Sequence, residues 1–330
     1  MKPRPRTADP RDVAERLQGE EQVLGVTHEA PDGDALGSLV ALLLMCERLG
    51  VPSAGYVPGG AAFPEEYTFL PGLATVLRGT APALTEGTTV YFLDCASSLR
   101  GDTGGFAKNN FCVNIDHHQD NPGFGDVNLV VPDAPSTTAI LYEVFKVGAL
   151  PLDEVIATAL YLGLVTDTGR FQYSNTTAAG HRMAAELQDI GCDVAAVYRQ
   201  VYESVPLPKM MLLQRMVSRM EPRLDGALVV SWLGDADLKE AGAHEGHTEG
   251  LIDTLRCLRG VRVAALARER KRGTALETKV SLRSTDGAVD VAELAHERGG
   301  GGHTRAAGFT SNDTVKSVLD WLEDALRGKL

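Results

Sequence analysis

Short apolar runs alternate with amphipathic segments through the first half of the chain, and this alternation restricts the fold more than any other feature. The runs expected as strands are rich in Val, Ile, Phe and Tyr and lie at 22–30, 52–58, 88–97 and 110–120. The segments expected as helices lie at 35–50, 134–148 and 152–169. Strands that alternate with helices favour a parallel sheet covered on both faces. The sequence therefore predicts an α/β fold.

Two prolines in "YESVPLPK", residues 202–209, interrupt this pattern, and we expect the connection between two domains near them. The second half contains three strand-like runs separated by helical segments, then a glycine cluster and an amphipathic helix. These lie at 227–233, 261–269, 278–284, 298–309 and 313–328. We expect an N-terminal parallel-sheet domain over 1–190, a linker over 191–208, and a smaller α/β domain over 209–330.

The composition argues against membrane proteins and disulfide-rich proteins. The chain has 44% hydrophobic and 23% charged residues, and no apolar run approaches the length of a membrane span. Its five cysteines are scattered and never form a C-x-x-C pair, so we expect neither a disulfide framework nor a zinc knuckle. The first residues lack the apolar stretch of a secretory signal. We therefore expect a cytoplasmic protein without a membrane partner.

The net charge of −12 is unevenly distributed. Residues 1–208 hold 13 Lys and Arg against 26 Asp and Glu, whereas residues 209–330 hold 19 against 18. Long nucleic acids are bound through many basic phosphate contacts, which an acidic first half does not offer. Such a half suits a site that neutralises its carboxylates with metal and receives a small ligand.

Histidines and aspartates gather where the expected strands and helices end. The stretch "VTHEAPDGDALGS" (26–38) carries three of them, and others follow later strands and one helix. The six candidate metal ligands are His28, Asp32, Asp34, Asp94, His117 and Asp167. Residues just past the carboxyl ends of parallel strands converge on one crevice, so these side chains are expected to meet there.

Six ligands are too many for one ion with open positions, but they suffice for two ions that share a carboxylate. Imidazole and carboxylate ligands without thiolate suit Mn²⁺ or Mg²⁺, and Co²⁺ as an alternative, rather than structural zinc. Two such ions clamp the attacking and leaving oxygens of a phosphoryl displacement. The sequence thus predicts a two-metal cage.

Five motifs together resemble a known family. In chain order they are "HEAPDGDALGS", "FLDCAS", "NIDHHQDN", "LVTDTGRF" and "GGGGHTRAAGF". They resemble the DHH phosphoesterases, specifically the small two-domain oligoribonuclease/3′-phosphoadenosine-5′-phosphate phosphatases with a DHH-associated C-terminal domain. The resemblance covers nearly the whole chain. It implies an active-site cleft between the DHH domain and the C-terminal substrate-binding domain.

The resemblance also implies a role for each residue at the metal edge. One ion would be held by His28, Asp32 and Asp94. The other would be held by Asp34, Asp94, His117 and Asp167, with Asp94 bridging. His118 would contact the scissile phosphate, and Asp116 would orient the histidines.

By the same resemblance, the C-terminal domain binds the part of the nucleotide away from the metals. The matching positions are Arg283, Gly300, Gly301, Gly302 and His303. Glycines let backbone N–H groups approach an anion closely, and an arginine grips phosphate bidentately. A flexible turn for the glycines and a surface role for Arg283 are the alternatives.

Two more arginines are substrate candidates from their positions. Arg268 is the residue of the "RERKRG" run nearest a strand, and Arg170 stands beside the ligand candidate Asp167. A structural salt bridge is the alternative for Arg170.

We therefore expect a hydrolase of very short nucleotides with two Mn²⁺ ions per chain. Expected substrates are oligoribonucleotides of a few residues, linear dinucleotides such as pApA and pGpG, and 3′-phosphoadenosine 5′-phosphate (pAp). The products would be nucleoside 5′-monophosphates. Long nucleic acid is not an expected substrate, and a homodimer is left open. One alternative is a cyclic di-AMP phosphodiesterase, which no residue excludes. Another is a nucleotide-binding sensor without turnover, against which the complete ligand set argues.

Overall fold

The structure is a computed structural model that describes residues 6–102, 105–272, 275–287 and 289–330. The chain divides into two units, Met1–Ser204 and Val205–Leu330. The division falls inside 191–208, where the sequence places the connection, and this stretch is largely helical. It contains α8 (Val194–Tyr198) and a π-helical turn, η3 (Arg199–Glu203). No helix among the described residues is long and apolar enough to cross a membrane.

The described strands of the first unit form one parallel sheet of seven strands, ordered β1-β7-β6-β5-β2-β3-β4. They are β1 (Arg6–Thr7), β2 (Gln22–Val26), β3 (Ser53–Pro58), β4 (Leu77–Gly79), β5 (Thr88–Leu93), β6 (Phe111–Asp116) and β7 (Val127–Val130). The chain runs from β2 outward to β4, then returns to the other side of β2 with β5. The strand order therefore reverses between β2 and β5, which is where open parallel sheets place their ligands.

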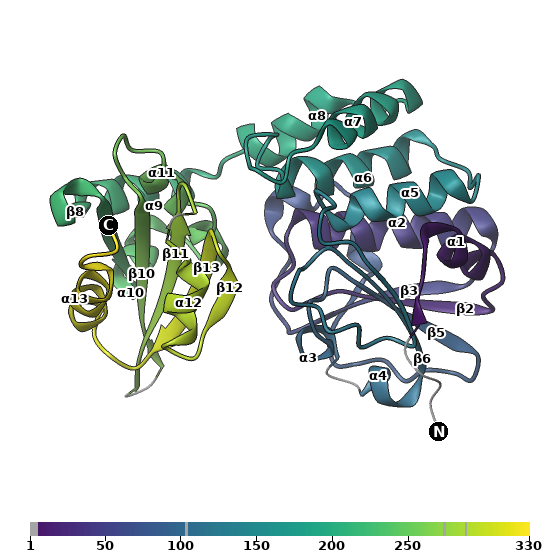
Figure 1. Cartoon of the computed structure of the whole chain (residues 1–330), viewed down its shortest axis with the longest axis horizontal. Coiled ribbons are helices and arrows are strands. Elements are labelled where there is room, and N and C mark those ends of the chain that lie inside the picture. The colour runs from purple at the N-terminus through teal and green to yellow at the C-terminus, as the bar shows by residue number, and fades with distance from the viewer. Residues whose placement is uncertain (1–5, 103–104, 273–274, 288) are drawn as a thin grey trace. The chain divides into compact units, whose positions relative to one another are not determined.

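Helices cover this sheet unequally. They are α1 (Pro10–Gln18), α2 (Gly33–Leu49), α3 (Ser98–Gly101), α4 (Phe106–Asn109), α5 (Thr137–Val147), α6 (Glu154–Asp167), α7 (Ala178–Ile190) and α8, with short 3-10 turns η1 (Glu65–Tyr67) and η2 (Leu73–Thr75). Figure 1 shows α1, α2, α5 and α6 on one face, with α7 and α8 stacked beyond them and α3 and α4 on the other. The expected parallel α/β arrangement is confirmed.

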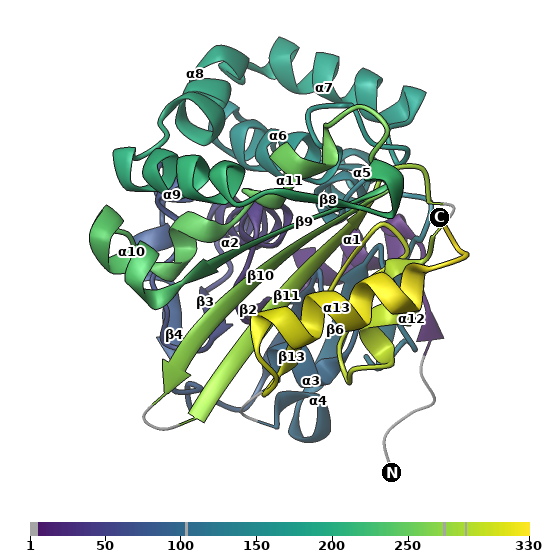
Figure 2. The same cartoon turned by 90° about the vertical axis from the view of Figure 1, so that its left-hand side faces the viewer.

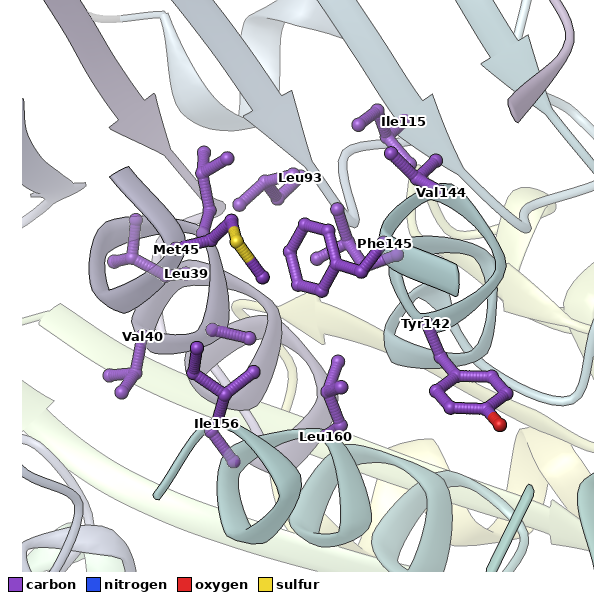
Figure 3. Packing of buried hydrophobic residues seen from close by; sticks show 14 of the residues in the cluster. Leu39, Val40, Met45, Leu93, Ile115, Tyr142, Val144, Phe145, Ile156 and Leu160 are labelled. Atoms are coloured by element: carbon purple, nitrogen blue, oxygen red, sulfur yellow. The ribbon is translucent and has the colours of Figure 1, made fainter. Parts of the chain in front are cut away.

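The larger buried cluster of this unit lies between the sheet and its long helices. Leu39 and Met45 of α2, Phe145 of α5, Leu160 of α6 and Leu93 of β5 belong to this cluster, and Figure 3 shows Met45 and Phe145 near Leu93, with Leu160 farther from it. These side chains are fully buried. Burial of such side chains contributes about 1.5–3 kcal/mol each, so these contacts hold α2 and α5 on the sheet and α6 on α2 and α5.

Helices α2 and α6 approach each other closely at glycines. A Cβ on Gly37 of α2 would lie 2.6 Å from the carbonyl oxygen of Ala159. A Cβ on Gly163 of α6 would lie 2.5 Å from Oδ1 of Asp34. These glycines therefore let the start of α2 and the end of α6 lie side by side, which places their carboxylates together.

The second unit contains a mixed sheet of six described strands, ordered β12-β13-β11-β10-β9-β8, in which β9 and β10 pair in parallel and the other pairs are antiparallel. The strands are β8 (Glu221–Arg223), β9 (Leu228–Gly234), β10 (Val263–Arg272), β11 (Ala275–Ser284), β12 (Gly301–His303) and β13 (Ala306–Ser311). The helices are α9 (Leu207–Ser218), α10 (Asp235–Ala241), α11 (Ile252–Arg256), α12 (Val291–His296) and α13 (Val315–Leu326), with 3-10 turns η4 (Leu224–Gly226) and η5 (Glu245–Thr248).

Both faces of this second sheet are covered. Figure 2 shows α13 and α12 on one face, where they bury Val280 and Leu282, while α9, α10 and α11 bury Ala264 and Leu266 on the other. One expectation is wrong here. Among the described residues, no helix separates the runs that become β10 and β11, because these strands pair directly in antiparallel register from Val263↔Ser284 to Arg272↔Ala275.

Candidate metal centre

The predicted ligands gather at the carboxyl edge of the first sheet and on two helices beside it. His28 follows β2, Asp94 follows β5, and His117 follows β6. These strands are neighbours, so the three side chains meet where the strand order reverses. The remaining carboxylates are helical. Asp32 and Asp34 begin α2, and Asp167 is the last residue of α6.

Asp94 lies at the centre of this cluster. Its Oδ2 is 3.6 Å from Nε2 of His28, and its Oδ1 is 3.6 Å from Nε2 of His117. The residue is buried and has a φ of 57°, the left-handed region that non-glycine residues rarely occupy. Such strain is concentrated at functional sites. By these two distances, the two carboxylate oxygens of Asp94 face two different imidazoles.

The orientation of His28 and His117 is set by backbone carbonyls. Nδ1 of His28 lies 2.9 Å from the carbonyl oxygen of Glu29, and Nδ1 of His117 lies 3.3 Å from that of Ala134. A carbonyl at Nδ1 holds a proton there, so Nε2 carries the lone pair when the ring is neutral. Metal-binding histidines are held in this way in proteins. Both rings thus present Nε2 toward Asp94.

Asp32 and Asp34 also hold helix N-termini. Oδ1 of Asp32 accepts hydrogen bonds from the backbone N–H groups of Asp34 and Ala35 and so caps α2. The two oxygens of Asp34 accept from the backbone N–H groups of Thr137 (2.6 Å) and Thr138 (3.0 Å), at the start of α5. The buried Asp34 therefore joins α2 to α5, and each oxygen keeps a lone pair for another ligand.

His118 is held differently from His117. Its Nδ1 donates to Oδ1 of Asp116 at 2.7 Å, and the other oxygen of Asp116 accepts from Nδ2 of Asn121 at 2.6 Å. Nδ1 of His118 is also 3.6 Å from Oδ1 of Asp94. An imidazole fixed by a buried carboxylate is suited to proton transfer. This arrangement supports separate roles for the two adjacent histidines.

Asp167 closes the cluster on the α6 side. Its Oδ2 is 3.8 Å from Nε2 of His117 and accepts a 3.1 Å hydrogen bond from Nδ2 of Asn175. The same amide group donates to the carbonyl oxygens of Asp167 and Pro135. Asn175 therefore fixes the carboxylate against the end of α6.

The protonation of the cluster reflects crowded negative charge. Burial, together with the Asp94 charge, raises the pKa of Asp34 to about 7, and burial raises that of Asp167 well above its usual range. Burial alone would lower the pKa of His117, but the carboxylates of Asp167, Asp34 and Asp94 outweigh it and raise it to about 9. Burial opposes the ionisation of Asp94, yet its hydrogen bond with His28 holds its pKa below the usual range. The carboxylates outnumber the imidazoles, so the cluster favours added cations.

The residues present fit divalent metal ions. At this edge of the first sheet, two sets of three side chains offer ligand atoms within 4.8 Å of one another, and both include Asp94. One set adds His28 and Asp32, and the other adds His117 and His118. Oxygen and imidazole donors without thiolate suit Mn²⁺, Mg²⁺ or Co²⁺. The cluster thus has the donor set of a metal centre with a shared carboxylate.

The predicted substrate residues of the second unit lie on its sheet. Arg268 is buried, and its Nη1 and Nη2 donate to Oγ1 of Thr248 (2.8 Å) and Oγ of Ser281 (3.0 Å). Its Nε has no hydrogen-bond partner among the described residues. Arg283 is half-buried, with Nε 3.5 Å from Oδ1 of Asp253. An arginine held by two hydroxyls keeps a positive charge available to a ligand.

Part of the glycine run lies in the edge strand β12 (Gly301–His303), and Gly300 directly precedes that strand. A Cβ on Gly300 would lie 2.1 Å from the carbonyl oxygen of Gly308, and a Cβ on Gly302 would lie 2.4 Å from that of Ala306. Packing against β13 therefore requires these glycines. A substrate role for Gly300, Gly301 and Gly302 stays a prediction, and the side chain of His303 lies outside the described part of the structure.

Arg170 lies beside the metal cluster with its side chain exposed. It has a φ of 63°, and its guanidinium lies 5.1 Å from the ring centroid of Tyr202. The salt bridge that we considered for it is not observed among the described residues. Its contact with substrate stays a prediction.

Sequence reasoning missed the residues that orient these ligands. Asn121 and Asn175 bind the carboxylates of Asp116 and Asp167, and Oγ1 of Thr137 donates to Oδ1 of Asp94 at 3.1 Å. Only Thr137 had a signal in the sequence, since "PSTT" before an apolar run marks the start of a helix.

Comparisons with known proteins agree with this geometry. Residues 22–164 match the family model for the N-terminal domain of the DHH family, and residues 225–328 match the DHHA1 domain. The bifunctional oligoribonuclease and PAP phosphatase NrnA of Thermus thermophilus is 33% identical over 299 residues, which cover 90% of this chain and 87% of that protein. A cyclic-di-AMP phosphodiesterase, GdpP of Geobacillus thermodenitrificans, is 28% identical over 95% of this chain but only 48% of its own length.

The fold also occurs in a crystal structure. An exopolyphosphatase-related protein from Bacteroides fragilis superposes with a TM-score of 0.86 and 23% sequence identity, and the match covers 97% of this chain and 96% of that one. This likeness concerns the fold alone.

Proposed function

The chain belongs to the DHH family and is a phosphoesterase, and we propose that it hydrolyses oligoribonucleotides of a few residues and pAp to nucleoside 5′-monophosphates. Linear dinucleotides such as pApA and pGpG fall within this substrate class. The relative from Thermus thermophilus, matched over most of both chains, is named for these two activities. The proposal gives this chain the same pair of substrates.

One observation carries the proposal most directly, namely the position of Asp94 between two ligand sets. His28 and Asp32 stand on one side of it, and His117 stands on the other with Asp34 and Asp167. We assign these six residues to two divalent ions, Mn²⁺ in the first place. Such ions, when bound, activate water and stabilise negative charge on phosphoryl oxygens.

His118 supplies the proton chemistry in this proposal. Asp116 and Asn121 fix its ring beside Asp94, so it is placed to protonate the oxygen that leaves phosphorus. Water adds to phosphorus and releases a proton to the solvent, the bond from phosphorus to the leaving oxygen breaks, and that oxygen receives the proton of His118. Burial alone would lower the pKa of His118, but the hydrogen bond with Asp116 and the charge of Asp94 outweigh it and raise the pKa, which favours the protonated form that this step needs.

The second unit has its own candidates for phosphate binding. Arg268 offers a buried guanidinium and Arg283 a half-buried one on adjacent strands. Hydrogen bonds from arginine to phosphate are charge-assisted and bidentate, so these two residues suit the second phosphate of a dinucleotide or of pAp. Two arginines suit a short ligand, whereas a long strand needs many more phosphate contacts.

A cyclic di-AMP phosphodiesterase is the more distant alternative, because the relative of that name is matched over less than half its length. A sensor without turnover is disfavoured by the complete ligand set. We also propose a cytoplasmic location, since the five cysteines are free thiols and four of them are buried.

The test is AMP release from pApA and pAp by the Mn²⁺-loaded protein, followed by chromatography. Asp94→Asn serves as the inactive control, because it keeps the side-chain shape and removes the shared charge. AMP from both substrates supports the proposal. Binding of pApA without AMP release would establish the sensor instead.

A further inference from the structure

A second arginine beside the metal centre has no role in the arrangement described so far. Arg100 lies in α3, the short helix that begins four residues after Asp94. Its segment also contacts the loop that carries His28, since the backbone N–H of Glu29 donates to the carbonyl oxygen of Arg100 at 3.2 Å. Arg100 is thus tied to two of the elements that hold metal-ligand candidates.

The next residue shows how tightly this helix is seated. A Cβ on Gly101 would lie 3.2 Å from Sγ of Cys95, 3.2 Å from Cγ1 of Val26 and 3.3 Å from the carbonyl oxygen of Thr27. These are tighter than ordinary van der Waals contacts. Gly101 therefore seats α3 against the ends of β2 and β5, and the position of Arg100 is fixed by backbone packing rather than by its own side chain.

The side chain of Arg100 itself is exposed, and it makes no hydrogen bond or ion pair within the described ranges. Its place at this edge of the sheet is set by the backbone. Arg100 follows Asp94 by six residues, and its carbonyl oxygen is hydrogen-bonded to Glu29, the residue after His28. Arg100 is therefore an exposed cation close in the fold to the carboxylate cluster, and it forms no salt bridge within the described ranges.

Other basic residues of this unit are already paired. Arg48 forms an ion pair with Asp153, and Lys146 forms one with Glu186. Arg170, three residues after Asp167, has its guanidinium over the ring of Tyr202. Arg100 has no such partner within the described ranges.

We propose that Arg100 binds the phosphate that reacts at the metal centre, with its guanidinium donating to the non-bridging oxygens from the His28 side. The ligand class is a phosphate mono- or diester. The inference deepens the proposed function and rests on its metal centre, but not on the identity of the nucleotide. Arginine donors aimed at a phosphoryl group stabilise the charge that its oxygens carry in the transition state.

The test uses bis(p-nitrophenyl) phosphate, which needs no nucleotide-binding residue. We expect Arg100→Ala to lower kcat/KM for this diester about 10- to 100-fold while metal content and melting temperature stay at wild-type values. Arg100→Lys should recover part of the loss, because it restores the charge without the fork of donors. Added guanidinium ion should raise the rate of Arg100→Ala. The matched control is Arg182→Ala, an exposed arginine of α7 far along the chain from the cluster, which should change nothing.

Several results would overturn this inference. A wild-type rate for Arg100→Ala would do so, and so would equal losses of rate and of melting temperature that guanidinium does not restore. The proposed function fails separately. The protein could cleave the small diester with this dependence on Arg100 and yet release no AMP from pApA or pAp. That result would support the role of Arg100 and contradict the proposed nucleotide substrates.

Discussion

His118 donates from Nδ1 to the buried carboxylate of Asp116 at 2.7 Å, whereas the adjacent His117 directs Nδ1 to a backbone carbonyl and Nε2 to Asp94. Two neighbouring histidines at the end of one strand thus have different partners. The difference predicts different chemical roles.

Replacing these histidines one at a time separates the roles. We expect His117→Ala to lose metal at one site, because its Nε2 faces Asp94 and Asp167. His118→Ala should keep two metals and turn over at least about 100-fold more slowly, as loss of a general acid does. Metal content by mass spectrometry, measured beside kcat, checks both. Equal metal loss in the two variants would show that the pair is wrongly assigned.

Asp94 is expected to be required for both ions. Asp94→Ala should remove both metals and nearly all activity, because both ligand sets depend on this carboxylate. His28→Ala should weaken one site and leave the other occupied. Titration of metal-free protein with Mn²⁺ provides the stoichiometries. An Asp94→Ala variant that still binds two ions would disprove the shared ligand.

Gly163 should be essential for the position of Asp34. A Cβ there would lie 2.5 Å from Oδ1 of Asp34 and 2.4 Å from Cγ2 of Thr138, so Gly163→Ala should lower the melting temperature and weaken metal binding. Gly180→Ala is the matched control in a neighbouring helix. Its Cβ would meet only ordinary contacts from 3.5 Å, so stability should be unchanged or slightly higher. The account fails here if both variants behave alike.

The metal-free protein should lose stability as pH rises. The pKa of Asp34 is raised from 3.8 to about 7, and that of His117 from 6.5 to about 9, so the folded state holds both protons more tightly than the unfolded state. The Asp34 contribution is complete below pH 3.8 and is lost through about pH 7. The His117 contribution is complete below pH 6.5 and is lost through about pH 9.

Bound metal should reverse this trend, because it binds the deprotonated ligands. Melting temperatures at pH 6 and pH 9, with and without Mg²⁺, test the prediction. The stabilisation by Mg²⁺ should be larger at pH 9. A metal-free melting temperature that rises from pH 6 to pH 9 would contradict it.

Arg283 should matter for dinucleotides and not for small diesters. Arg283→Ala should lower kcat/KM for pApA about 10- to 150-fold, as loss of a charge-assisted hydrogen bond does, and leave bis(p-nitrophenyl) phosphate unaffected. Arg262→Ala, at a half-buried arginine of the same unit paired with Asp286, is the control. Parallel losses on both substrates would mean that Arg283 supports the fold instead.

The sequence predicted the ligands that follow strands, because the alternation of strands and helices already places His28, Asp94 and His117 at one edge of a sheet. It could not predict Asn121 or Asn175, since their partners depend on how loops return to that edge. The sequence also did not predict that Asp34 serves both as a ligand candidate and as the acceptor for backbone N–H groups at the start of α5. The carboxylate meets the start of α5 more than one hundred residues later, which only packing of α2 against α5 and α6 decides.

In the second unit, the sequence signal is clear but fits two different structures. The run "GGGG" is read from sequence as a loop for an anion, yet part of it is the strand β12, whose close approach to β13 accounts for Gly300 and Gly302. Glycine is required by both explanations, so composition alone does not separate them. Arg268 was singled out by its place on a strand, but its burial between two hydroxyls depends on the cross-strand position of Ser281 and on the η5 turn.

The central claim is that one metal centre, built around Asp94, serves short nucleotides. The most direct measurement compares kcat/KM of the same Mn²⁺-loaded protein for pApA, pAp, cyclic di-AMP and a 24-residue RNA. The account predicts AMP from pApA and pAp, each at a kcat/KM at least about tenfold above that for either other substrate, with all activity lost in Asp94→Asn. A 24-residue RNA cut as readily as the dinucleotide, or cyclic di-AMP cleaved faster than pApA, would contradict it.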